Sequence, residues 1–359
     1  MDLDHVEALR RRPGMYIGDT CDGTGLAHMI WELVANAVDE HLAGRCSRIA
    51  VDIKPDGSVM VEDDGRGMPL QVVDGVPFPE RAFTTRRRTP TLDGHAHEHL
   101  LSNGVGLSPV CALSSWLELE VFQGGRRYWQ RFERGKPLSS CEDGGFADRT
   151  GTIVAFAPDP QIFSSVWINP GPILARLREL SCLLPRLTFA FHDRREHVFH
   201  EPRGFQALLD ARAPSHLSPG PTFSATGKVG AILVEVAARW GSLDRASIES
   251  YANLVRTTDG GSHVDGALRG LAEGLKRAAP GRCEGVPRDS LERAVKQGLV
   301  AIVRVRLDDP SFSGPNHDRL APPEATVAVH QCVADAFQAF LLQHPSTLEA
   351  LVAKLPVAG

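Results

Sequence analysis

Apolar residues recur every three to four positions between residues 24 and 44, which predicts an amphipathic helix. Shorter runs rich in Val and Ile predict strands at 48–54 and 58–62, and the turn Pro55-Asp56-Gly57 between them indicates a hairpin. Similar patterns predict further strands at 117–122, 128–133 and 152–157. Helices beside antiparallel hairpins are typical of an α+β fold rather than a doubly wound parallel sheet.

The composition changes between residues 201 and 227, where Pro, Ser, Gly and Ala dominate. Such a segment favours a domain boundary. Beyond it the pattern predicts strands at 231–240 and 298–307 and helices at 262–279 and 324–344. We therefore expect a first domain over 1–201, a linker region over 202–227 and a second α+β domain over 228–359.

Charge and cysteine content narrow the class of protein. The 359 residues carry 39 Lys and Arg against 44 Asp and Glu, a net charge of −5, which lacks the basic excess of an autonomous nucleic-acid binder. No run approaches the roughly eighteen apolar residues of a membrane span, and the N-terminus has no apolar signal core. The seven cysteines are scattered without a C-x-x-C pair. We expect a cytoplasmic protein with no membrane partner.

A polar stripe lies on the helix predicted at 24–44. Glu32, Asn36 and Asp39 are spaced by four and three residues, which places them on one side of the helix, and Glu40 adjoins them. Taken alone, this stripe is typical of a solvated helix face. The alternative is a functional site, because other candidate residues follow along the chain.

A second candidate segment, Asp63-Asp64-Gly65-Arg66-Gly67-Met68, follows the strand predicted at 58–62. Its acidic groups end the strand, and its glycines allow the backbone to approach a flat ligand closely. As an isolated turn the segment would be unremarkable.

A third segment, Asn103-Gly104-Val105-Gly106-Leu107, opens an apolar helical run. Its backbone N–H groups and the positive end of the helix dipole can bind a phosphate. The chain has neither a G-x-x-x-x-G-K-[ST] loop nor a dinucleotide fingerprint after its first strand, so any ATP site is of another kind.

The order of these motifs resembles the N-terminal ATPase region of the B subunits of bacterial gyrase and topoisomerase IV, in the GHKL superfamily. The motifs are Arg12-Pro13-Gly14-Met15-Tyr16-Ile17-Gly18, Glu32 to Glu40, Asp63 to Gly67, Gly104-Val105-Gly106 and Thr150-Gly151-Thr152, followed by Asp259-Gly260-Gly261-Ser262-His263 in the second half. The resemblance covers nearly the whole chain. It implies a GHKL-type ATP-binding α/β sandwich followed by a smaller transducer domain with a ribosomal S5-like fold.

The resemblance also implies roles for individual residues. Glu32 is the expected general base for the water that attacks the γ-phosphate, and Asn36 the expected ligand of nucleotide-bound Mg²⁺. Asp63 is expected to accept the adenine amino group, with Thr152 supporting it and Gly67 packing against the ring. The remaining expected nucleotide-binding residues are Asp39, Arg66, Met68, Asn103, Gly104, Val105 and Gly106.

Some positions differ from that family. His317, in Pro315-Asn316-His317, stands where the family has a lysine that reaches the γ-phosphate, so a mostly neutral imidazole replaces a cation. The lid segment reads Leu100-Leu101-Ser102-Asn103 without the usual glycines. Trp129 stands at the strand position where the family has an arginine at the pocket mouth, although Arg131 lies close by. The alternating His95, His97 and His99 lack the helical spacing or cysteine partners of a zinc site.

Two functions follow from these residues. The first is a gyrase B-like enzyme that hydrolyses Mg-ATP with lid closure or homodimerisation. The second is a weak pseudo-ATPase that senses nucleotide, regulates gyrase or sequesters pocket inhibitors. The short segment before Arg12 predicts a weak dimer. The resemblance ends in the transducer region, so we expect no DNA cleavage by this chain alone, and gyrase A or DNA as partners only within a larger assembly.

Overall fold

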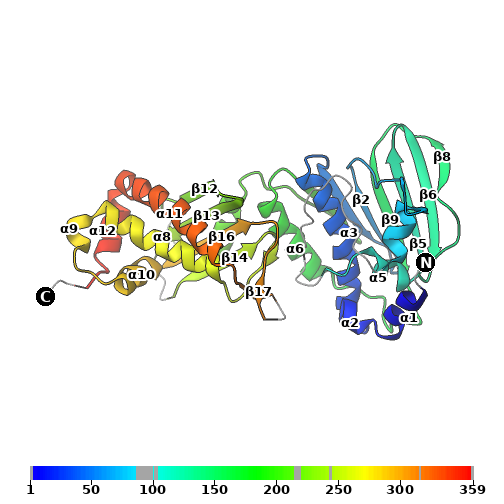
Figure 1. The fold of residues 1–359 in the computed structure, drawn as a ribbon, viewed down its shortest axis with the longest axis horizontal. Coiled ribbons are helices and arrows are strands. Elements are labelled where there is room, and N and C mark those ends of the chain that lie inside the picture. The colour runs from blue at the N-terminus through cyan, green and yellow to red at the C-terminus, as the bar shows by residue number, and fades with distance from the viewer. Residues whose placement is uncertain are drawn as a thin grey trace. The chain divides into compact units, whose positions relative to one another are not determined.

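A computed structural model of the chain describes residues 3–85, 100, 104–213, 220–241, 245–314 and 317–356. It divides into two compact units, Met1–Pro202 and Arg203–Gly359 (Figure 1). The segment expected to be a linker contains helix α7 (Phe205–Arg212) and the first residues of β12 (Phe223–Val229). Leu208 and Leu209 of α7 are buried, so apolar burial stabilises this helix despite the composition of the chain around it.

The first unit combines helices with a mostly antiparallel sheet (Figure 1). Its helices are α1 (Leu3–Arg11), α2 (Gly14–Ile17), α3 (Thr24–Leu42), α4 (Phe78–Thr84), α5 (Leu107–Ala112) and α6 (Pro170–Leu183). Its strands are β1 (Arg48–Ile53), β2 (Val59–Asp63), β3 (Val72–Val73), β4 (Val76–Pro77), β5 (Ser114–Gln123), β6 (Arg126–Glu133), β7 (Lys136–Pro137), β8 (Glu142–Phe146), β9 (Gly151–Pro158), β10 (Thr188–His192) and β11 (Glu196–Phe199).

The main sheet of this unit has the order β11-β10-β1-β2-β9-β5-β6-β7, with β8 also paired to β6. Only the β1–β10 pair is parallel among these described strands. Along β2, burial alternates from residue to residue, which is the pattern of a sheet with one face on the core. The predicted helix at 24–44 and the predicted strands are confirmed, and the fold class is α+β as expected.

Local interactions define the ends of α3. The Asp22 carboxylate accepts hydrogen bonds from the backbone N–H of Thr24 at 2.9 Å and from its hydroxyl at 2.6 Å, just before the first helical turn. At the other end, Gly44 has a φ of 77° and its N–H donates to the His41 carbonyl at 2.8 Å. The helix is therefore fixed at both ends and packs on β1 and β2.

The second unit is also α+β (Figure 1). Besides α7, its helices are α8 (Ser262–Ala278), α9 (Pro280–Cys283), α10 (Arg288–Lys296), α11 (Pro323–Gln343) and α12 (Pro345–Val352). Its strands are β12, β13 (Ile232–Trp240), β14 (Ser247–Ala252), β15 (Val255–Arg256), β16 (Leu299–Arg306), β17 (Phe312–Ser313) and β18 (Arg319–Leu320). Five of them form a sheet of order β12-β13-β16-β14-β15, in which β14 and β16 are parallel.

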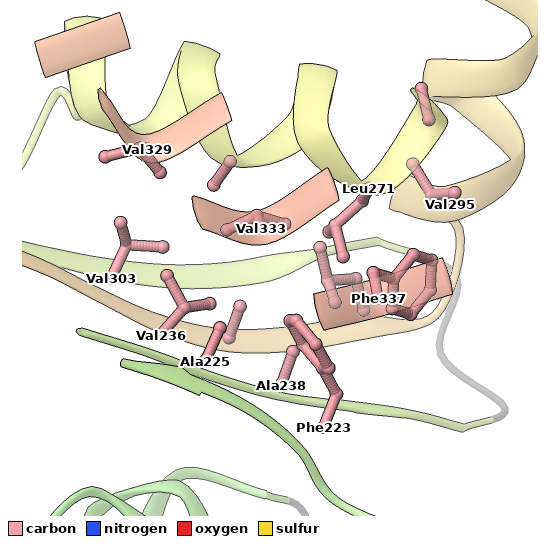
Figure 2. Close-up of a cluster of buried hydrophobic side chains, with 14 of the residues drawn as sticks. Phe223, Ala225, Val236, Ala238, Leu271, Val295, Val303, Val329, Val333 and Phe337 are labelled. Atoms are coloured by element: carbon pink, nitrogen blue, oxygen red, sulfur yellow. The ribbon is translucent and has the colours of Figure 1, made fainter. Parts of the chain in front are cut away.

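Figure 2 shows the core of this unit, where side chains of α8 and α11 meet the sheet. Phe337 is fully buried, and its ring lies 5.1 Å from the ring of Phe223 and 5.1 Å from that of Trp240. Val236 and Val303 contribute from the strands. The unit thus has its own apolar core.

Glycines of α8 let α11 approach unusually closely. A Cβ at Gly266 would lie 2.5 Å from the carbonyl oxygen of Thr326, and one at Gly270 would lie 2.8 Å from Val333. One at Gly274 would lie 2.9 Å from the Ala334 carbonyl oxygen. These contacts leave no room for a side chain, so the two helices pack backbone against backbone over this stretch.

Helix α11 is long and apolar enough, by length and composition, to cross a membrane, and it is the one such helix among the described residues. No such segment was expected from the sequence. Val329, Val333 and Phe337, spaced by four residues, are buried in the core of the second unit. A core helix meets the same criterion, so this finding is weak evidence for a membrane span.

Candidate functional site

The polar stripe of α3 is buried rather than solvated. Glu32 is 6% exposed and Asp39 is 2% exposed, and Asn36 is half-buried between them. Carboxylates are rarely buried unless hydrogen bonds or a function retain them. Of the two interpretations open for the stripe, burial favours a site.

Glu32 is hydrogen-bonded to the glycine-containing segment that precedes α5. The backbone N–H of Val105 donates to Glu32 Oε1 at 3.1 Å, and that of Gly106 donates to Oε2 at 2.8 Å. Both donors lie where helix α5 begins, so they are N–H groups left without a partner inside the helix. The structure therefore joins the expected base directly to the expected phosphate-binding segment.

His28 completes the surroundings of Glu32. It lies one turn earlier on α3, and its Nε2 is 3.2 Å from Glu32 Oε1. His28 belongs to no recognised motif, although its i, i+4 spacing from Glu32 is a signal for this contact. The imidazole and the two amides together fix the orientation of the carboxylate.

Helix α1 holds α5 in place from the other side. Arg10 donates through Nη1 to the Ala112 carbonyl at the end of α5, at 2.8 Å, and through Nη2 to Asp159 Oδ2 at 2.7 Å. His5 Nε2 lies 3.1 Å from Ser108 Oγ within α5. Both ends of this short helix are thus anchored, which positions the amides at its start.

Asn36 fits the role of an oxygen ligand for a cation. Its Nδ2 donates to the Glu32 carbonyl at 2.7 Å, so the side-chain oxygen is the atom left for a ligand. A neutral oxygen suits Mg²⁺, a hard ion that takes most of its remaining ligands from phosphates and water. Among the described residues, no group of three or more His, Cys, Asp or Glu side chains could hold a metal by itself.

Asp63 ends β2 inside the unit. It is 8% exposed, it lies opposite Thr152 of β9 in the sheet, and its Oδ1 accepts the backbone N–H of Gly65 at 2.8 Å. Burial raises the pKa of Asp63 to about 7, an effect that the Gly65 hydrogen bond offsets in part and that the nearby Glu40 increases. Asp63 is thus a buried carboxyl group that titrates near neutrality.

The neighbouring Asp64 has a different environment. Its Oδ1 accepts the backbone N–H groups of Ser47 at 2.7 Å and Arg48 at 2.9 Å. These bonds hold the start of β1 beside the end of β2. Because successive strand residues point to opposite faces, only one carboxylate of the pair can face a ligand from this side.

Backbone geometry at Gly67 requires glycine. Its φ is 87°, and a Cβ there would lie 2.8 Å from the Phe122 carbonyl oxygen. The next residue, Met68, donates its N–H to Thr152 Oγ1 at 3.1 Å. Strand β9 therefore holds the 65–68 segment in place, with Thr152 bridging between Asp63 and Met68.

Arg66 pairs with a residue that the sequence analysis did not assign to the site. Its Nε donates to Glu40 Oε1 at 3.1 Å, which ties the 65–68 segment to α3. Gln123, at the end of β5, places its Nε2 3.5 Å from the Arg66 carbonyl. Trp129 lies in β6, opposite Glu120 of β5, so it occupies a strand as expected. Its place at the mouth of a nucleotide pocket stays a prediction.

Some expected residues lie elsewhere or outside the described part of the chain. His317 belongs to the second unit, between β17 and β18, where its ring stacks on Phe312 at 4.6 Å and its φ is 58°. Asn103, the segment 86–99 with His95, His97 and His99, and Pro315 and Asn316 are not among the described residues. In the first unit, hydrogen bonds join Glu32 to Asn36, Val105 and Gly106. A second set joins the segment 63–68 to Thr152 and, through Glu40, to α3.

Comparisons with known families match both units. Residues 21–158 match the model of "Histidine kinase-, DNA gyrase B-, and HSP90-like ATPase", and residues 204–358 match the model of "DNA gyrase B". The first match contains all the described site residues of the first unit, and the second contains His317.

Whole-chain comparisons agree. The chain is 34% identical to the B subunit of DNA gyrase from Halalkalibacterium halodurans over 98% of its length and 57% of that relative's. It is 36% identical to the B subunit of DNA topoisomerase 4 from Streptococcus pneumoniae over 98% of its length and 56% of that relative's. The crystal structure of the 43K ATPase domain of Thermus thermophilus gyrase B, in complex with an aminocoumarin, matches with a TM-score of 0.84 and 34% identity, over 98% of this chain and 94% of that one. The chain spans little more than half the length of the curated relatives.

Proposed function

Since the chain belongs to the DNA gyrase B family, we propose that its first unit binds ATP between α3, the end of β2 and the segment at the start of α5, and hydrolyses it to ADP and phosphate. The observation that carries this proposal is the joining of a buried carboxylate, Glu32, to the paired amides of Val105 and Gly106. These are the two groups that hydrolysis of a phosphoanhydride needs side by side: a base for water and donors for phosphate oxygens.

At the adenine end, Asp63 is the acceptor for the exocyclic amino group. A buried carboxylate that already accepts one backbone N–H has further lone pairs for a ligand. Gly67 is expected to pack against the adenine ring, and Thr152 and Met68 form the adjoining wall. Arg66 and Asp39 support this wall and α3.

At the phosphate end, the amides of Val105 and Gly106 exchange the Glu32 carboxylate for phosphate oxygens. Glu32 is then free to orient and deprotonate water, with His28 holding its position. Asn36 is the protein's ligand for Mg²⁺, which when bound neutralises charge on the phosphates. His317 takes the place of the lysine that the family places at the γ-phosphate.

A pseudo-ATPase is the second candidate function, and one observation favours it. The residue at position 317, where the family has a lysine, is a histidine. Such a protein would bind adenine nucleotide, or an inhibitor directed at the same pocket, with little turnover.

Phosphate release at saturating Mg-ATP separates the two. An ATPase releases phosphate in a steady state that Glu32→Ala abolishes, whereas a pseudo-ATPase shows equal background for both proteins. Asp63→Ala, measured by calorimetry, tests the pocket itself. Loss of the adenine partner costs roughly 1–3 kcal/mol, so unchanged nucleotide affinity in this variant would reject the pocket assignment.

Assembly completes the proposal. We expect a homodimer that forms with nucleotide, and contact with a gyrase A subunit or DNA only in a larger assembly, since the gyrase and topoisomerase 4 relatives are considerably longer. Sedimentation with a non-hydrolysable ATP analogue tests the dimer, and a tight dimer without nucleotide would reject nucleotide control. The cytoplasmic location stays a prediction.

A further inference from the structure

The second unit has a hollow on its helical side that the proposed ATPase function does not use. It has a volume of about 330 Å³ and lies among α8, α10 and α11. We call it the cationic groove and define it by Arg269, Ala272, Glu273 and Lys276 of α8 and Arg288 and Leu291 of α10.

Helix geometry explains the shape of the groove. Arg269, Ala272, Glu273 and Lys276 follow one another at intervals of three, one and three residues, so they form a single stripe along α8. Ala272 is 3% exposed and Leu291 is 4% exposed, and both belong to the apolar core of the unit. The groove therefore has an apolar floor, and longer charged side chains surround it.

Charge in the groove is unbalanced. Arg269, Lys276 and Arg288 bring three cations from two helices, against the one carboxylate of Glu273. That carboxylate already accepts Arg277 Nε at 2.8 Å. Arg288 has a partner in Glu292 at 2.7 Å, but the arginine side chain is 55% exposed, and ion pairs of this kind contribute little.

The other two cations have no described acceptor. Within the described ranges, no hydrogen bond or ion pair to a carboxylate engages Arg269 or Lys276, and both are exposed. Arginine presents a planar fork that matches the oxygens of a phosphate or carboxylate, and lysine adds a point charge. The chemistry of the rim is thus that of a site for an oxyanion.

The size and the floor restrict the ligand further. A volume of about 330 Å³ is at the lower end of small-molecule sites, and Val327 of α11, 63% exposed, adds an apolar side wall. An extended nucleic-acid surface would need a longer track of cations than three, and the net charge of the chain is −5. We propose that the cationic groove binds a small organic phosphate, with its phosphate on Arg269, Lys276 and Arg288 and its apolar body on Ala272, Leu291 and Val327.

The test uses the full chain with phenyl phosphate as the probe, measured by calorimetry with the ATP pocket saturated by a non-hydrolysable analogue. Phenyl phosphate should bind more tightly than inorganic phosphate, because only the former covers the apolar floor. The double variant Arg269→Gln/Lys276→Gln should weaken binding at least about tenfold, since a charge-assisted hydrogen bond corresponds to about that factor.

Two further variants make the test specific. Val327→Glu places a carboxylate beside the groove at an exposed position and should abolish phenyl phosphate binding. Arg282→Gln is a control for attraction by overall charge, because it removes one exposed cation of the same unit outside the groove, where Arg282 has a 3.7 Å ion pair to Glu349. It should leave binding unchanged. Thermal unfolding of each variant should match that of the parent.

Several results would overturn the proposal. Equal affinity for phenyl phosphate and inorganic phosphate would show that the apolar floor of the groove does not contribute to binding. An equal loss in Arg282→Gln would indicate attraction by overall charge only. Binding of short duplex DNA that the double variant abolishes, without binding of phenyl phosphate, would assign the groove to nucleic acid instead. None of these results depends on hydrolysis of ATP, so the proposed function stands or fails separately.

Discussion

The contact between Glu32 and the amides of Val105 and Gly106 predicts that removing the carboxylate strengthens nucleotide binding while it abolishes hydrolysis. In this arrangement ATP has to displace Glu32 before its phosphates can accept the two N–H groups, at 3.1 and 2.8 Å from the carboxylate oxygens. In Glu32→Ala only water competes for them. The substitution therefore strengthens binding of the nucleotide phosphates, whereas the hydrolysis step that needs Glu32 as a base is lost.

The magnitude follows from the two hydrogen bonds. A hydrogen bond to a charged group contributes about 1.5–3 kcal/mol net, so relief of one such bond corresponds to roughly tenfold to a hundredfold in affinity. Both hydrogen bonds have ordinary lengths, but they are made to the same carboxylate, so their free-energy contributions are not added in full. We therefore expect a gain of about tenfold or more for ADP and for a non-hydrolysable ATP analogue.

Calorimetry with three ligands checks the reasoning. ADP and the ATP analogue should bind Glu32→Ala more tightly than the parent protein, whereas adenosine, which has no phosphate, should bind both equally. Glu32→Gln keeps one acceptor oxygen without charge and should give a smaller gain. If the variant bound the phosphorylated ligands no better than the parent, or if adenosine gained as much, the carboxylate would not be competing for these amides.

Three other predictions concern single residues. The pKa of Asp63 is raised to about 7, so a fall in pH from about 8 to about 6 protonates this carboxylate in the empty pocket. The affinity for ADP should therefore fall up to about tenfold over this range, and Asp63→Asn should remove the pH dependence. An affinity of the parent protein that did not change with pH would contradict this prediction. His317→Lys should raise the rate of phosphate release at about pH 7.5, because one hydrogen-bond donor to the charge that develops in the transition state contributes a factor on the order of 10²–10³ in rate. An unchanged rate would mean that residue 317 lies away from the phosphates. Phe337→Ala should lower the free energy of unfolding by about 3–5 kcal/mol in denaturant titrations, since the ring is fully buried between two others; a loss below about 1 kcal/mol would not fit this packing.

The sequence predicted the long elements well because their patterns are strong. The helix at 24–44 has eight apolar positions at helical spacing, and the strands around residues 50 and 60 flank a clear turn. Short elements such as β3 and β17, with two residues each, are too brief to show any period. Helix α7 was missed because its apolar positions lie within a segment rich in Pro and Gly.

The site divides in the same way. The motifs alone predict Glu32, Asn36 and Asp63 as site residues, and these assignments stay predictions. The burial of Glu32 and Asp63 is information that the sequence did not provide. The pairing of Arg66 with Glu40 spans 26 residues, and the approach of Gln123 to Arg66 spans 57. Such contacts depend on which strands become neighbours and in which register, and hydrophobic patterning specifies faces of a strand rather than partners.

The glycine contacts of α8 have a mechanical consequence. Helices usually slide past one another through small shifts of interlocking side chains. Between α8 and α11 there are few side chains to yield, because the Thr326 and Ala334 backbone lies where side chains at Gly266 and Gly274 would begin. The two helices should therefore move together as one rigid body, and a displacement at the N-terminus of α8 should produce a matching displacement at its C-terminus.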